Sequence, residues 1–185
     1  IGSGTLDLDA GTGDLTMSAD ATLNTVDGDI RLRAGDATAD SITLGDLFAT
    51  NANVSIVTPG SVLDTADADN EVEALSLRID AGVGVGLLGA TANSIETAVD
   101  TLSVIVRGSA GINILEDDAL TIGDTAAITV QTVGTDAEVT ENVEQTQSDV
   151  VTTGENGANG SILIRTEAGD LTLTEGTAQI DADTD

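Results

Sequence analysis

The sequence predicts an all-β fold in which short strands stack as a β-solenoid, also called a parallel β-helix. A short phrase recurs along the 185 residues: a small residue or Gly, a polar residue, and then an apolar, a polar and an apolar residue. One copy cannot bury its apolar face alone, whereas stacked copies bury one another. The apolar residues are chiefly Ala, Val, Ile and Leu, and Phe48 is the only aromatic. This supply suits a narrow aliphatic interior better than a broad globular core.

The first third of the chain holds the clearest copies of the phrase. Their alternation of apolar and polar residues predicts strands with one buried face. Asp, Gly, Ala and Thr separate them, and these residues suit tight turns. The predicted strands lie within residues 4–8, 13–17, 28–32 and 40–44. A further strand is expected at 51–57, and Pro59, the single proline, ends it.

The rest of the chain repeats the pattern with two interruptions. Strands are expected at 75–79, 102–106, 112–114, 118–122, 125–130, 160–164 and 169–173. An acidic stretch covers 63–73, and a polar, Gly-rich stretch at 134–159 is expected to be a loop excursion with at most a weak strand. Residues 90–99 are the one candidate for a helix. We therefore expect residues 1–185 to form a single β-solenoid segment of a longer repeat protein.

The fold makes a specific prediction about side chains. The apolar residues of the repeated phrase should point into one elongated interior, on parallel strands about 4.8 Å apart along the axis. The predicted interior residues are Leu6, Leu8, Leu15, Met17, Ile30, Leu32, Ile42, Leu44, Ile112, Ile114, Leu120, Ile122, Ile162, Ile164, Leu171 and Leu173.

The Gly-Asp-Ile/Leu phrasing resembles the repeat regions of filamentous-haemagglutinin-like giant bacterial surface adhesins. The most similar block contains Gly84-Val85-Gly86, residues 92–102, Gly111-Ile112-Asn113-Ile114 with Glu116, and residues 120–123. The resemblance covers most of the chain except 134–159. It implies a right-handed parallel β-helix, export to the bacterial cell surface or medium, and a role in adhesion or fibre building. It supplies no catalytic residues.

The charge of the chain restricts its partners. The formal net charge is −28, from 33 acidic and five basic residues. Such a charge repels nucleic acid and anionic membranes, so we expect neither nucleic-acid binding nor membrane insertion. The acidic surface could serve solubility alone, or it could collect divalent cations. The chain has no Cys, so neither disulfides nor thiolate metal sites are possible.

The acidic stretch at 63–73 is the best candidate for a metal site. Asp64, Asp67, Asp69 and Glu71 could gather around Ca²⁺, which prefers carboxylate and carbonyl oxygens. Their spacing does not match an EF-hand loop, because the central Gly and the last Glu of that loop are missing. A solvated acidic loop is the alternative interpretation. No other cofactor is expected.

An enzymatic role is not expected. His, Lys, Tyr, Trp and Cys are all absent, which removes most catalytic bases and nucleophiles and the aromatic platforms of sugar-binding sites. Gly84, Gly86 and Gly89 form a GxGxxG pattern, but the chain lacks the βαβ rhythm of a dinucleotide site. A flat threonine array for ice binding is not evident either, because Asp, Arg, Ser and Asn occupy equivalent positions.

The predicted function is therefore mechanical. We expect a structural or adhesive segment that forms a stiff stalk or filament outside a bacterial cell. Its partners would be neighbouring repeats or identical subunits end to end, and a host or partner-cell surface. The alternative is a Ca²⁺-dependent adhesin module built from tandem β-sandwiches. The two differ in fold, since sandwiches have separate cores and a solenoid has one continuous stack.

Overall fold

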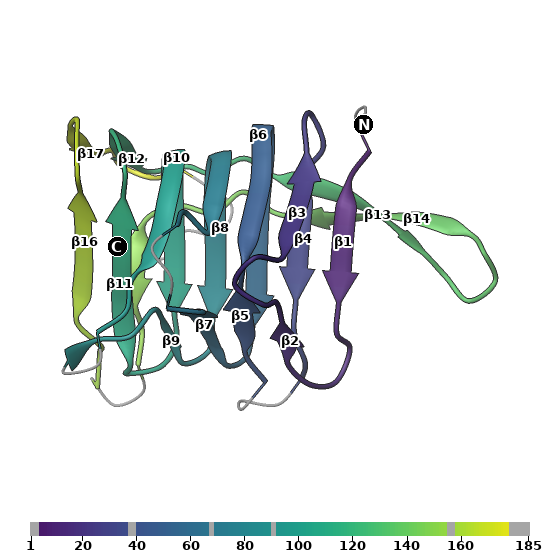
Figure 1. Ribbon diagram of the computed structural model, residues 1–185, viewed down its shortest axis with the longest axis horizontal. Helices are drawn as coiled ribbons and strands as arrows, with labels where there is room; N and C mark the ends of the chain where they lie inside the picture. The colour runs from purple at the N-terminus through teal and green to yellow at the C-terminus, as the bar shows by residue number, and fades with distance from the viewer. Residues whose placement is uncertain (1–3, 37–39, 67–68, 90–91, 155–157, 178–185) are drawn as a thin grey trace.

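A computed structural model describes residues 4–36, 40–66, 69–89, 92–154 and 158–177. The fold is all-β, a parallel β-solenoid of about 5 turns (Figure 1). No α-helix occurs in the described residues, and β10 (Ile95–Val106) occupies part of the segment considered as a helix. In these same ranges no helix is long and apolar enough to cross a membrane.

Three ladders of parallel strands form the stack. The first joins β1 (Leu6–Asp9), β4 (Ile30–Arg33), the ends of β6 (Asp46–Thr58), β8 (Val72–Ala81) and β10, and finally β15 (Val150–Thr152). The second joins β2 (Leu15–Thr16), β5 (Ile42–Leu44), β7 (Ser61–Asp64), β9 (Gly84–Val85), β11 (Gly111–Glu116) and β16 (Ile162–Thr166).

The third ladder begins at β3 (Thr22–Thr25) and continues through the starts of β6, β8 and β10 to the end of β11. The long strands β6, β8 and β10 therefore serve two ladders each. β12 (Leu120–Ile122) pairs with the middle of β10, and β17 (Leu171–Leu173) pairs with β12. This single stack of parallel strands shows that the tandem β-sandwich alternative is wrong as a fold.

Equivalent residues recur once per coil, about 24 positions apart in the first ladder and less evenly in the second, where Ile112 and Ile162 are 50 positions apart. In the first ladder Leu6, Ile30, Val54, Leu77 and Leu102 pair in succession. In the second ladder the column contains Leu15, Ile42, Val62, Val85, Ile112 and Ile162. Such aliphatic columns fill the interior without aromatic residues, because every coil adds a side chain of similar size at the same place.

Most of the predicted interior residues are confirmed, and three are wrong. Nine belong to the buried core: Met17, Ile30, Leu32, Ile42, Leu44, Ile112, Ile114, Leu120 and Ile122. Leu6, Leu8, Leu15 and Ile164 are partly buried against it. However, Ile162, Leu171 and Leu173 are 46%, 41% and 72% exposed. They lie on β16 and β17, the last described coil, so no described coil covers their outer side.

The segment 134–159 contains more regular structure than a bare loop. β13 (Ile128–Val133) and β14 (Val139–Glu144) form an antiparallel hairpin, and β15 then returns to the first ladder. The hairpin extends beyond β1 at the opposite end of the stack from β16 (Figure 1). Its backbone contacts the first coil, where Gln131 N donates a hydrogen bond of 3.0 Å to Thr5 Oγ1.

Candidate functional site

Three carboxylates from two neighbouring coils meet at one corner of the solenoid. Asp64 ends β7, Glu71 immediately precedes β8 in the same coil, and Glu96 is the second residue of β10 in the next coil. One oxygen of each carboxylate lies within 4.8 Å of the others. The ladder itself brings the two coils together, since Glu71 N donates a hydrogen bond of 3.0 Å to Glu96 O. We call these three residues the carboxylate cluster.

The cluster is only partly satisfied by hydrogen bonds. Asp64 Oδ2 accepts from Asn93 Nδ2 at 2.6 Å and from Ala66 N at 2.8 Å. Glu71 Oε2 accepts from Glu96 N at 2.6 Å, and Glu96 Oε1 accepts from Ser94 Oγ at 2.7 Å. Asp64 Oδ1 and Glu96 Oε2 are buried and have no partner. Buried polar atoms of this kind are costly and rare in folded proteins.

Burial dominates the electrostatics of the cluster. Glu71 is only 2% exposed, and loss of hydration raises the pKa of its carboxyl from 4.5 to about 9. The hydrogen bond from the Glu96 backbone opposes this rise in pKa, while the charges of Asp64 and Glu96 and a hydrogen bond to the Asp64 side chain add to it. Without a cation, the cluster therefore holds a proton at neutral pH. When a cation is present, the cluster offers it three carboxylate oxygens, which are ligands that hard divalent ions prefer.

The structure brings together two of the four residues predicted for a metal site. Asp64 and Glu71 belong to the cluster. Asp69 is exposed and faces a neighbouring groove instead, and Asp67 lies outside the described residues. Glu96 was missed because it is 25 positions from Glu71 in sequence. The coil period of about 24 residues was the available signal, because it places Glu96 one coil after Glu71.

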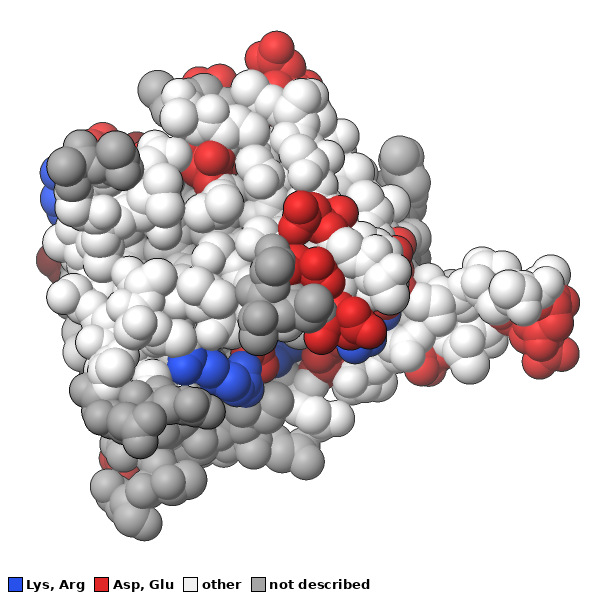
Figure 2. Space-filling model, turned by 90° about the horizontal axis from the view of Figure 1, so that it is seen from below, with Lys and Arg blue, Asp and Glu red and all other residues white. Residues whose placement is uncertain are grey.

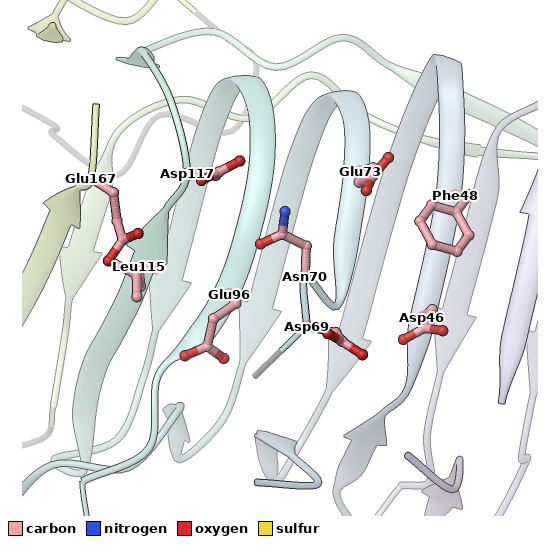
Figure 3. A pocket seen from close by; sticks show the side chains of 9 residues that line it. All are labelled: Asp46, Phe48, Asp69, Asn70, Glu73, Glu96, Leu115, Asp117 and Glu167. Carbon is pink, nitrogen blue, oxygen red and sulfur yellow. The ribbon is translucent and has the colours of Figure 1, made fainter. Parts of the chain in front are cut away.

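An acidic groove of about 680 Å³ runs beside the cluster across successive coils. Its carboxylates come from neighbouring strands and turns, as Figure 3 shows. Glu73 pairs with Phe48 in the third ladder, which places a carboxylate beside the one aromatic ring. The residues that line the groove are Asp46, Phe48, Asp69, Asn70, Glu73, Glu96, Leu115, Asp117 and Glu167.

A second buried polar feature lies on the first ladder. One position per coil forms a polar column of paired residues: Asp7, Arg31, Ser55, Arg78 and Ser103. Arg31 forms a two-pronged ion pair with Asp7, at 2.8 and 2.9 Å. This ion pair and its hydrogen bonds raise the pKa of Arg31, whereas burial lowers the pKa of Arg78.

The hairpin covers this column and is tied to it. We call the hairpin and its flanks, residues 125–147, the strap. Glu144 accepts hydrogen bonds of 3.1 Å from both Arg31 and Arg78. Gln147 is fully buried, accepts from Arg78 at 3.0 Å and donates to Ile79 O at 3.0 Å. The strap thus neutralises buried guanidinium charge that the coils alone would leave poorly compensated.

The GxGxxG glycines serve the turns of a coil. Gly84 lies in β9, and Gly86 has a φ of +64°, a value that favours glycine. A Cβ on Gly86 would lie 2.5 Å from Asn113 O in the next coil. Close backbone approach therefore explains this glycine without a bound nucleotide.

Comparison with known proteins finds no match: no family model, no curated protein and no solved structure is significantly similar to this chain.

Proposed function

We propose that this chain is a structural or adhesive segment of a large secreted or cell-surface bacterial protein, where it forms part of a stiff stalk or filament. The observation that carries the proposal is the unbroken stack with a single aliphatic interior. In such a stack every coil is held to the next by ladder hydrogen bonds along the axis, which makes the solenoid resist bending. The resemblance of the repeated phrases to filamentous-haemagglutinin-like adhesins supports the same role.

The last described coil supports an end-to-end arrangement. Within the part of the chain that the structure describes, β16 and β17 each pair on one side only, and they expose Ile162, Leu163, Leu171 and Leu173. Unpaired strand edges with apolar side chains are templates for further strands. A neighbouring repeat or an identical subunit would cover them. A contact between this end and the opposite end of the next subunit is head to tail and therefore extends a filament.

The acidic side chains fit a surface exposed to solvent or to other cells. Figure 2 shows several carboxylates on one face and at the end of the projecting hairpin, where Asp136 and Glu138 lie. A net charge of −28 keeps such filaments apart and soluble. The proposal includes attachment of the filament to a host or partner cell, through a receptor or surface on that cell.

The test is end-to-end association in solution. Sedimentation and small-angle X-ray scattering should show the chain as a rod that lengthens with concentration. Replacing both Leu171 and Leu173 with Lys should abolish this growth without unfolding the chain, because both side chains are exposed on the last coil. Leu75→Lys is the matched control, since Leu75 is 43% exposed on β8 in the middle of the stack.

Two results would contradict the proposal. One is a particle of constant, compact shape at every concentration and in a tandem fusion of two copies. The other is a loss of association in the Leu75→Lys control equal to that of the end variant, which would mean sideways aggregation.

A further inference from the structure

We propose that Asp64, Glu71 and Glu96 bind one hard divalent cation, with Ca²⁺ the best fit, and that this ion fastens one coil of the solenoid to the next. The inference goes beyond the mechanical role, since a stack can be stiff with or without an ion. It assigns a metal site in which one of the ligands, Glu96, comes from a neighbouring coil.

The first argument is charge. The chain has five basic side chains, all of them arginines within the described residues. Their ion pairs are all formed elsewhere: Arg31 with Asp7 and Glu144, Arg33 with Asp9, Arg78 with Glu144, Arg107 with Asp80 and Arg165 with Glu167. No basic side chain is therefore left to neutralise the cluster, and a proton on Glu71 removes only one of its negative charges. A bound divalent cation neutralises the rest.

The second argument is independent of charge and concerns unpaired atoms. Asp64 Oδ1 and Glu96 Oε2 are both buried, and neither has a hydrogen-bond donor when the three carboxylates are ionised. The other oxygens of these two carboxylates are held in place by Asn93, Ala66 and Ser94. The two side chains are thus oriented by neighbours, with one free oxygen each. Glu71, 98% buried beside them, supplies the third ligand.

The third argument is size. Calcium binds oxygen at 2.3–2.6 Å, so two ligand oxygens on opposite sides of the ion are about 4.8 Å apart. The three oxygens of the cluster lie within 4.8 Å of one another, a separation that ligands of one Ca²⁺ can have. Mg²⁺ usually keeps several waters and is bound through one or two carboxylates, so a set of three protein carboxylates favours Ca²⁺. Carbonyl oxygens and water would complete the shell.

The position of the cluster defines what the ion does. Asp64 and Glu71 flank residues 65–70, and Glu96 belongs to the following coil. An ion held by all three links Asp64 and Glu71 of one coil to Glu96 on β10 of the next. It also replaces repulsion between carboxylates with attraction to a shared charge. Binding should therefore stabilise the folded chain.

The experiment is a Ca²⁺ titration of the wild-type chain, Glu71→Gln and Asp117→Asn in 0.15 M NaCl. Binding is measured by equilibrium dialysis with ⁴⁵Ca²⁺, and unfolding by circular dichroism, because the chain has no Trp or Tyr. We expect one tight site in the wild type and a rise of roughly 5–10 °C in melting temperature at a hundredfold excess over Kd. Glu71→Gln should weaken that site at least about tenfold and remove the rise.

Asp117→Asn is the control because it makes the same carboxyl-to-amide change at an exposed position on the neighbouring groove. It should bind and respond as the wild type does. Mg²⁺ should raise the melting temperature less than Ca²⁺. If Glu71→Gln does not fold, Glu96→Gln takes its place. Equal Ca²⁺ affinity in the cluster variant and the control, or equal stabilisation by Ca²⁺ and by NaCl of matched ionic strength, would overturn the proposal.

Discussion

Buried carboxylates are the distinctive residues of this protein. Glu116, at the end of β11, is fully buried and accepts hydrogen bonds from Thr97 Oγ1 at 2.7 Å and Val99 N at 3.0 Å. Loss of hydration raises the pKa of its carboxyl to about 7, although these hydrogen bonds oppose the rise. It occupies an inward column that holds Leu23, Leu47 and Val72 in earlier coils.

Glu116 should make stability depend on pH. Because its pKa is raised from 4.5 to about 7 in the folded chain, the folded state holds the proton more tightly than the unfolded state. Its contribution to stability is complete below about pH 4.5 and is lost as the pH rises through 7. On going from pH 5 to pH 8, the unfolding free energy of Glu116→Gln should therefore rise by about 1–3 kcal/mol relative to that of the wild type.

Urea unfolding followed by circular dichroism, at both pH values in EDTA, measures this difference. The comparison between variant and wild type removes the contribution of Glu71, whose pKa is also raised and which both chains share. A difference in unfolding free energy between the two chains that does not change with pH would contradict the prediction. Glu138→Gln, on the exposed hairpin, provides the control for a change of charge alone.

At the scale of elements, the strap is the exception to the repeat. Its strands are antiparallel, and it lies against coils that are distant in sequence. Two of its side chains, Glu144 and Gln147, complete the polar column from outside. The strap is thus held by its base, while its tip at 134–138 extends past β1 (Figure 1).

Removing the charge of Glu144 should loosen the strap. Glu144→Gln leaves the buried guanidinium of Arg78 without its ion pair, and we expect a loss of about 2–4 kcal/mol in unfolding free energy. Glu141→Gln is the control, because Glu141 is exposed on the same strand, β14. Chemical denaturation of both variants measures the difference. Equal stability of Glu144→Gln and Glu141→Gln would mean that solvent already screens the charge of Arg78.

The tip of the strap should be the first site of proteolysis. Its exposed backbone at 134–138 lacks the ladder contacts of the coils, and Val133 and Val139 beside it are 69% and 59% exposed. Trypsin cannot cut the strap, since residues 125–147 contain no Lys or Arg. A Glu-specific protease should cut after Glu138 before any site in the coils. Amide exchange at the tip as slow as in β8 or β10 would argue against this.

At the scale of the whole molecule, like charge opposes the stack. Each coil lies about 4.8 Å from the next, and 33 acidic residues share the surface with five basic ones. Salt screens such repulsion, with a Debye length of about 8 Å at physiological strength and about 30 Å at 0.01 M. Raising NaCl from 0.01 M to 0.15 M should therefore increase the melting temperature.

Differential scanning calorimetry of the wild type in EDTA measures this effect of screening. The expected direction is the reverse of that for a protein held together by surface ion pairs, which salt weakens. A melting temperature that falls as NaCl rises would show that the arginine ion pairs outweigh the repulsion. Glu71→Gln should follow the same salt dependence, because screening acts on the whole surface.

Sequence alone determined the fold class and much of the interior. The alternation in phrases such as 28–32 reports a local property, one apolar face on one short strand, and stacking is the way to bury many such faces. Thus Ile30, Leu32, Ile42 and Leu44 were predicted in the core and lie there. The exposure of Leu171 and Leu173 could not be predicted, since it depends on what covers the last coil.

Only the tertiary structure decided which polar residues meet. The cluster of Asp64, Glu71 and Glu96 depends on the register of two coils, and a slip of one residue would turn Glu96 to the other face. The same holds for Glu144, which reaches Arg31 from 113 positions away because the strap folds back along the stack. The alternation of apolar and polar residues along a short strand determines which faces are buried. Contacts between charged groups are instead determined by the length of each coil and by the insertions between coils.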